Sequence, residues 1–98
     1  MQFFARVTSY QKNTMLNICD AEFIGKTISE GELNMNISKS YYGDKSVDQE
    51  EAKTLLQKAS IINMVGNEII SMSVSLGIGS KNGIKLISGV PFLIVFKM

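Results

Sequence analysis

The sequence predicts an α+β fold in a single domain, residues 1–98, and three observations lead to this prediction. A chain of 98 residues has room for one hydrophobic core. Segments near both ends alternate apolar and polar residues, as strands do, whereas the middle carries a clear helix start. We expect a four- to five-stranded mixed or antiparallel sheet, with one long bent or broken helix (about 48–76) packed on one face and a short helical turn near 21–25.

The chain opens with a predicted β-hairpin. Residues Gln2–Tyr10 alternate in the manner of a strand with one better-buried face, and Met15–Cys19 form the returning strand. Residues 11–14 have the composition of a turn. Asp20 is typical of a helix N-cap, and the short helical turn that it begins is expected to stop at Gly25.

The next predicted strand is Leu33–Ser38, in which three apolar residues alternate with asparagine and serine, so one of its faces should contact water. A connector, 26–32, precedes it. Tyr41 and Tyr42 follow in a turn. Paired tyrosines in a loop could stack on bases or close the end of the core, and the second interpretation is favoured because tyrosine commonly buries its ring.

The segment 48–76 carries the strongest helix signals of the chain. Asp48 and Glu51 have the spacing of a capping box, and Val47 with Ala52 form a hydrophobic staple beside it. Two apolar stripes rotated from one another follow, at Ala52, Leu55, Leu56, Ala59 and Ile62, and at Ile62, Val65, Ile69, Met72 and Leu76. The rotation predicts a bend or break between Ser60 and Gly66, and Gly77 ends the helix.

Within that helix, Ala59, Gly66 and Ser73 would form a lane of small residues. Such a lane lets another group approach the helix backbone, and this group is either the protein's own sheet, which we favour, or a partner. Asn63 lies on a neighbouring line between aliphatic residues and needs a hydrogen-bond partner if it is buried. We expect it to bond to the backbone near Gly89 or Val90.

The C-terminal part is predicted to add two strands. The glycine-containing segment 77–83 follows a helix and fits neither phosphate-binding fingerprint, so it is interpreted as a connector. A short strand at 84–87 then turns at 88–89 into Val90–Phe96. The continuous apolar run of this last strand predicts cover on both faces, with Pro91 tolerated at its beginning.

Composition restricts the chemistry. The chain has one cysteine, Cys19, and no histidine, which leaves few ligands for zinc or copper and no imidazole base for the thiol. We therefore expect no cofactor and no metal. No apolar run reaches the length of a membrane span, and the start lacks the layout of a signal peptide, so a cytoplasmic protein is expected.

Charge is distributed unevenly along the chain. Residues 1–51 carry five basic and eight acidic side chains, net −3, and residues 52–98 carry five basic and one acidic, net +4. A weakly cationic surface formed by the second half is compatible with contacts to phosphate groups, although it falls short of a dedicated nucleic-acid patch.

Several short motifs occur together in one order: residues 19–26 (Cys-Asp-Ala-Glu-Phe-Ile-Gly-Lys), 30–33 (Glu-Gly-Glu-Leu), 41–43 (Tyr-Tyr-Gly), 63–66 (Asn-Met-Val-Gly) and 88–91 (Ser-Gly-Val-Pro). In these motifs the chain resembles, nearly end to end, the archaeal family of uncharacterised conserved proteins named domain of unknown function 424. Many members place an acidic residue after the glycine of the fourth motif and a histidine after the fifth. This chain has Asn67 and Phe92 there. The resemblance implies an archaeal cytoplasmic protein and no established activity.

The function expected from the sequence is that of a non-catalytic binding module that docks on RNA or a ribonucleoprotein, with an association with translation suggested by analogy. The alternative is a protein-interaction or self-associating module that uses Met64, Ile70 and Val74, and an enzyme is least expected. The candidate binding residues are Asn63, Gly66, Asn67, Glu68, Gly89, Val90, Pro91, Lys81, Lys85, Tyr41 and Tyr42. Lys58 is a further candidate for a phosphate contact.

Overall fold

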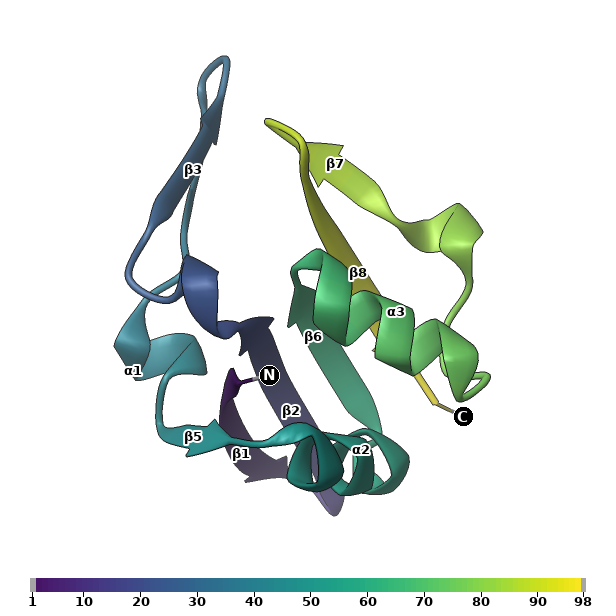
Figure 1. Ribbon diagram of the computed structural model, residues 1–98. Coiled ribbons are helices and arrows are strands. Elements are labelled where there is room, and N and C mark those ends of the chain that lie inside the picture. Colours follow the sequence, from purple (N-terminus) through teal and green to yellow (C-terminus); the bar gives the residue numbers. More distant parts are fainter. Residues whose placement is uncertain (1, 98) are drawn as a thin grey trace.

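The computed structural model describes residues 2–97 and contains eight strands and three α-helices (Figure 1). The strands are β1 Phe3–Tyr10, β2 Asn13–Asp20, β3 Thr27–Glu30, β4 Leu33–Asn36, β5 Lys45–Val47, β6 Ile61–Val65, β7 Lys85–Ile87 and β8 Val90–Phe96. The α-helices are α1 Lys39–Tyr42, α2 Gln49–Lys58 and α3 Asn67–Ser75, and two short 3-10 turns, η1 Ala21–Phe23 and η2 Lys81–Gly83, complete the order.

Six strands form one sheet in the order β5-β1-β2-β6-β8-β7, and β3 pairs with β4 in a separate hairpin. The pairing of β2 with β6 is parallel, and the other pairs are antiparallel. The α+β class is thus confirmed. The expected four to five strands were too few. The predicted strand Leu33–Ser38 corresponds to β4, but β3 was interpreted as a connector, β6 was assigned to the helix, and the short β5 was not predicted.

The long helix predicted over 48–76 was wrong. The segment folds as α2, then strand β6, then α3, so the expected break is a complete strand. Ile62 and Met64 alternate with residues of the opposite face, and this period of two was hidden because a short apolar run also fits helical spacing. Pairing of β6 between β2 and β8 overrides any local helical preference.

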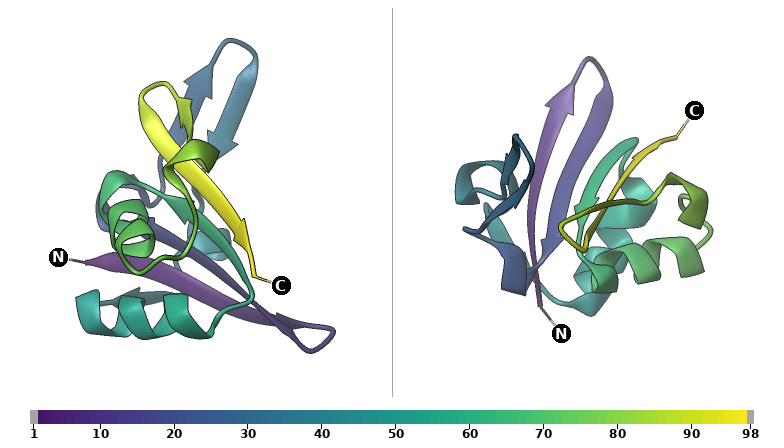
Figure 2. Two further views of the ribbon diagram at one scale, coloured as in Figure 1. Left: turned by 90° about the vertical axis from the view of Figure 1, so that its right-hand side faces the viewer. Right: turned by 90° about the horizontal axis from the view of Figure 1, so that it is seen from above.

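The main sheet has two different faces (Figure 2). The covered face packs against α2 and α3 and holds the larger core, which includes Leu16 and Ile18 of β2 and Ile62 and Met64 of β6. The opposite face, called the open face here, is covered at one end by α1 and the β3–β4 hairpin, where Tyr42 and other residues form a second, smaller core. The rest of the open face is uncovered.

The predicted ends and turns agree well with the structure. The first hairpin turns at Gln11 and Lys12, which both have positive φ angles of 47° and 71°. Asp48 Oδ1 accepts a hydrogen bond from Glu51 N at 2.9 Å and caps α2 as expected. After α3, Gly77 has a φ of 77°, which confirms its role as the helix stop.

Strand β8 differs from its prediction in one respect. Its side chains Leu93 and Val95 pack into the core of the covered face, but Ile94 and Phe96 on the open face are 58% and 65% exposed. The predicted cover on both faces therefore holds only for the first half of the strand, where Val90 and Phe92 pack against the smaller core. Pro91 does lie at the start of the strand, opposite Leu86 of β7.

Candidate functional site: a hollow on the open face

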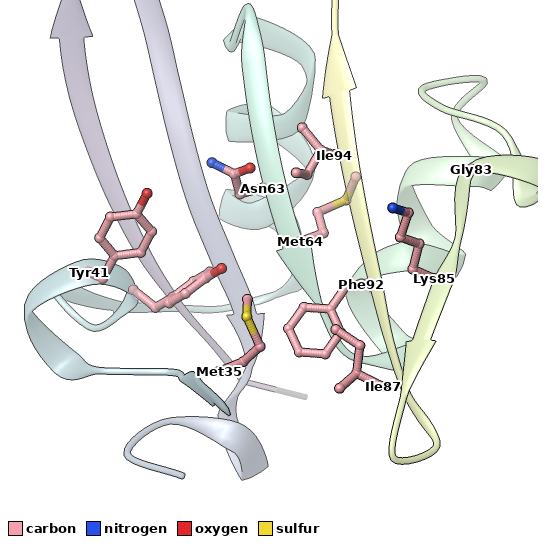
Figure 3. Close-up of a pocket in the computed structure, with 10 residues that line it drawn as sticks. Met35, Tyr41, Asn63, Met64, Gly83, Lys85, Ile87, Phe92 and Ile94 are labelled. Atoms are coloured by element: carbon pink, nitrogen blue, oxygen red, sulfur yellow. The ribbon is translucent and has the colours of Figure 1, made fainter. Parts of the chain in front are cut away.

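The open face contains a hollow of about 510 Å³. Its lining comes from β4, α1, β6, η2, β7 and β8, as Figure 3 shows. The lining residues are Met35, Tyr41, Tyr42, Asn63, Met64, Gly83, Lys85, Ile87, Phe92 and Ile94. Most of this surface is aliphatic or aromatic, and two polar side chains, Asn63 and Lys85, are set into it.

Asn63 is held in the floor of the hollow by β2. Its Nδ2 donates to Asn17 Oδ1 at 2.7 Å, and Asn17 Nδ2 donates to the Tyr41 carbonyl at 3.2 Å. The partner of Asn63 is therefore the adjacent strand, and the predicted bond to the backbone near Gly89 or Val90 was wrong. Strand register explains this result, since Asn63 lies opposite Asn17 on one side and Ile94 on the other.

The amide oxygen of Asn63, Oδ1, is open to the hollow. Among residues 2–97 no hydrogen-bond donor reaches Asn63 Oδ1, and no fully buried side-chain oxygen or nitrogen there lacks a partner. The oxygen must therefore reach solvent. It is an acceptor in an apolar surface, already oriented by the bond from Nδ2 to Asn17.

Two side chains of the sheet fix helix α1 and so set the position of Tyr41. Arg6 Nη1 donates to the Ser40 carbonyl, and Asn17 donates to the Tyr41 carbonyl. The Tyr42 ring is buried in the smaller core, with the Tyr41 ring packed edge-on at 5.3 Å between centroids. Tyr42 thus closes the core, as the sequence favoured, whereas Tyr41 is half exposed at the hollow.

The charge of the hollow is positive. Lys85, on β7, is the cation among its described lining residues, and no carboxylate is found with it. Phe92, at the position where the family pattern places a histidine, lies opposite Lys85 in the sheet and contributes its ring to the lining. The sequence placed Lys85 and Tyr41 among the binding residues, and both line the hollow.

The two hairpins beside the hollow touch at their ends. Ser88 N donates to Glu30 Oε1 at 2.8 Å, and Ser88 Oγ donates to the Ser29 carbonyl. These contacts link the β7–β8 turn to β3, although the two segments are far apart in sequence. The second and fifth sequence motifs therefore meet at the rim of the molecule, where they support the hairpins that flank the hollow.

Gly66 has a structural role, but for a different reason than predicted. It precedes α3 with a φ of 116°, and a Cβ added there would overlap the carboxyl group of Asp20. Gly66 N donates to the Pro91 carbonyl at 3.0 Å, which is the direct link between the fourth and fifth motifs. Ala59 and Ser73 are also buried, so the interpretation of a lane open to a partner was wrong.

Asp20 is the residue that needs this glycine. Its two carboxyl oxygens accept from Glu68 N and Ile69 N, both at 2.9 Å, and cap α3. The sequence assigned the cap to the turn at 21–25, where the Asp20 side chain makes no capping bond. Burial raises the pKa of Asp20, and the two N–H donors act in the opposite direction. The side chains of Asn67 and Glu68 are exposed on the first turn of α3.

The predicted lysines do not form one surface. Lys58 ends α2 on the covered side of the sheet, and Lys81 lines a second hollow, of about 460 Å³, beside α3. Of the three predicted apolar contacts, Met64 and Ile70 are buried in the main core and Val74 packs against it. That apolar surface was wrong, because it rested on the helix that β6 replaces.

Cys19 lies in the smaller core beneath α1. Burial, followed by the nearby Asp20 carboxylate, raises the pKa of its thiol to about 12. Within the described part of the chain no three acidic or cysteine side chains gather at one point. The longest α-helix, α2, has ten residues, and none of the described helices could cross a bilayer.

Sequence reasoning missed Asn17, Arg6 and Met35 as parts of the site. Asn17 and Arg6 had a usable signal, since each is a polar residue with an apolar residue on either side of it in its strand. Their significance depends on β2 pairing in parallel with β6, which places Asn17 beside Asn63. Met35 carried no signal, because the contact between the small hairpin and the main sheet is tertiary.

The fold and the hollow define a class of protein: a small α+β domain with a mixed six-stranded sheet, two helices on one face and an apolar hollow on the other. The chain belongs to the family described as Protein of unknown function (DUF424), which matches residues 8–98. The fold is similar to the crystal structure of an uncharacterized conserved protein from Methanopyrus kandleri, with a TM-score of 0.80 and 20% sequence identity over 100% of this chain and 95% of that one. A search of curated proteins gives no match.

Proposed function

We propose that the protein is a non-catalytic binding module whose open face binds single-stranded RNA, either free or exposed on a ribonucleoprotein. The observation that carries the proposal is the composition of the hollow. It joins the Tyr41 and Phe92 rings, the open Asn63 oxygen and the Lys85 ammonium. A nucleobase has apolar faces and a polar edge, and it is held by aromatic stacking together with hydrogen bonds to that edge.

Each polar group of the hollow suits one part of a nucleotide. The Asn63 oxygen can accept from an exocyclic amino group, since its own Nδ2 is already bonded to Asn17. Lys85 can contact the phosphate that follows the base. The finer parts of the proposal, a cytoplasmic location and a role near translation, rest on analogy with other small RNA-handling proteins.

Few charges take part, and this determines how binding should respond to salt. Each single-strand phosphate contact contributes a slope of about −0.7 in log K against log salt. Lys85 contributes one such contact, and Arg6 is already bonded to Ser40. We therefore expect a shallow slope of roughly −1 and an affinity that depends on stacking more than on charge.

The test is fluorescence anisotropy with labelled eight-nucleotide RNAs, a DNA of the same sequence and a duplex, at four salt concentrations. Tyr41→Ala should weaken single-strand binding about tenfold, because stacking on an aromatic ring contributes ~1–3 kcal/mol per base. Lys85→Gln should reduce the salt slope by about 0.7. The matched control is Lys58→Gln, an exposed lysine on the covered side.

Two results would contradict the proposal: no binding of any RNA at high protein concentration, or equal losses with Lys85→Gln and Lys58→Gln. The second candidate function, a protein-interaction or self-associating module, is favoured by the exposed Ile94 and Phe96 at the end of β8. Retrieval of partners from native extract separates the two. A complex that survives nuclease and high salt supports the interaction module.

A further inference from the structure

We infer that the outer edge of β8 at Ile94–Phe96 pairs with the same edge of a second copy of this chain, so that two sheets join about a twofold axis. This inference is independent of RNA binding. It rests mainly on the backbone of β8, whereas the proposed function rests on side chains of the hollow. Ile94 belongs to both, so Phe96→Lys, at a residue that does not line the hollow, is the variant that separates them.

Half of the outer edge of β8 has no partner strand. Strand β7 pairs with β8 only from Val90 to Phe92, and β8 continues past the end of β7 toward the C-terminus (Figure 1). Lys97 N donates to the carbonyl of Ser60, the residue before β6. Backbone groups of successive residues in a strand point to opposite sides, so the odd-numbered residues of β8 face β6 and the even-numbered residues face away from it. The N–H and C=O groups of Ile94 and Phe96 therefore point outward, and no backbone group among residues 2–97 pairs with them.

The side chains at this edge are apolar and exposed. Ile94 and Phe96 extend from the open face beside the unpaired backbone groups. Natural edge strands are usually short or protected by charges, proline or a bulge. The other two edges of the sheet follow that rule, since β5 and β7 have three residues each and carry Lys45 and Lys85. At the end of β8, Gly79 and Gly83 lie against the side chains of Val95 and Leu93, but residues 93–96 contain no charge or proline that would protect the outward backbone groups.

The occupant that fits is the same segment of a second copy. Residues 90–96 carry no charge, so antiparallel pairing of the segment with itself brings no like charges together. The nearest charge, Lys97, is turned away, because its Nζ donates to the Leu56 and Gln57 carbonyls at 2.6 and 3.0 Å. A twofold axis at Val95 places Ile94 of each copy opposite Phe96 of the other copy. In this register the outward N–H groups of Ile94 and Phe96 each meet a carbonyl of the second copy.

The test is the oligomeric state of the whole protein, measured by sedimentation velocity over a concentration series. We expect a monomer–dimer equilibrium. Phe96→Lys and Ile94→Lys should each weaken the dimer by about tenfold or more, because an ammonium would be buried against an apolar partner. The matched control is Leu86→Lys, at a residue that is 64% exposed on β7, and it should leave the dimer unchanged.

The register is tested by a double variant. Ile94→Lys combined with Phe96→Glu would place opposite charges across the twofold axis and should recover dimerisation relative to either single variant. The far-ultraviolet circular dichroism of each variant reports whether it is folded. A monomer at every concentration, a dimer insensitive to the single variants, or no recovery in the folded double variant would each overturn the inference.

Discussion

The two faces of the main sheet are closed by different means. On the covered face, β2 and β6 present aliphatic side chains such as Leu16, Ile18 and Ile62 to two amphipathic helices. On the open face the same two strands present Asn17 and Asn63, which bond to one another. The first arrangement derives its stability from burial of apolar area. The second uses polar contacts to position α1, and it leaves a hollow.

Under the proposed function, the difference assigns stability to the covered face and recognition to the open face. The link between the two regions is the junction of Asp20, Gly66 and the start of α3. Substitutions at this junction should behave as core substitutions. Substitutions in the hollow should change binding more than stability, and the following predictions test that distinction in order of decreasing effect.

The largest effect is expected for Gly66→Leu. A side chain there would overlap the Asp20 carboxyl group, and the φ of 116° is strained for any residue with a Cβ. We expect a loss of about 3 kcal/mol or more in the free energy of unfolding, measured by urea denaturation. Gly89→Ala is the control, since Gly89 has a φ of 78° but an open surrounding. If the two variants lost equal stability, the Asp20 contact would be irrelevant.

The second effect concerns the cap itself. Asp20→Ala should cost about 2 kcal/mol, because two N–H groups at the start of α3 lose their acceptor. Asp20→Asn keeps the shape but replaces one acceptor by a donor, so its loss should be smaller than that of Asp20→Ala. If Asp20→Ala unfolded at the same urea concentration as the wild type, the Asp20 cap would not contribute to the stability of α3.

The same carboxyl group has an unusual pH dependence. Its pKa in the folded protein lies above its ordinary value of 3.8, since burial outweighs the two hydrogen bonds. The folded state therefore binds this proton more tightly than the unfolded state. The stabilisation from that proton is complete below pH 3.8 and disappears as the pH rises through the raised pKa. The stability difference between wild type and Asp20→Asn should shrink over that range in pH-dependent urea denaturation, and a growing difference would contradict the direction of the shift.

Features that depend on local signals were predicted better than those that depend on strand pairing, and the reason is physical. Local signals such as the Asp48 cap and the stop at Gly77 depend on neighbours in the chain, so they could be recognised from residue types. Strand β6 could not, because five residues with several aliphatics fit two periodicities and only pairing with β2 and β8 decides between them.

The candidate site was predicted in part for the same reason. Tyr41, Asn63 and Lys85 stood out as residue types that bind, and all three line the hollow. Gly66 and Pro91 were grouped with them, yet they join backbone to backbone at the end of the sheet. A sequence pattern can indicate that a residue has a particular role. Whether that role is to contact a ligand or to allow a backbone conformation depends on the residues that surround it in the fold.

A smaller effect is expected in the hollow. Asn63→Leu removes the donor to Asn17, whose own amide is buried, and should lower the free energy of unfolding by about 1 kcal/mol. It should also shift the amide resonance of Tyr41, since Asn17 donates to the Tyr41 carbonyl. Asn36→Leu, at an exposed amide on β4, is the control. An unchanged Tyr41 resonance would show that α1 does not depend on the two amides.

The smallest effect concerns Cys19, for which we expect almost no reaction in the folded protein. The thiol is buried beneath α1 beside Ile37, Tyr42 and Val65, and a pKa of about 12 leaves roughly one thiolate in ten thousand at pH 8. Alkylation by iodoacetamide should therefore require opening of the structure. If α1 lifts from the open face by itself, its opening would expose Cys19 while the covered face stays folded.

The two modes of opening differ in their response to a distant substitution. Leu56→Ala, in the larger core of the covered face, destabilises the whole fold, so it should accelerate alkylation of Cys19 only if the thiol is reached by global unfolding. Asn63→Leu weakens the support of α1 and should accelerate alkylation in both cases, by more than its effect on global stability if α1 opens locally. For each variant, the increase in the alkylation rate of Cys19 is compared with the loss in the free energy of unfolding. This comparison decides whether α1 opens independently of the covered face. Equal ratios would mean that both faces of the sheet unfold as one unit.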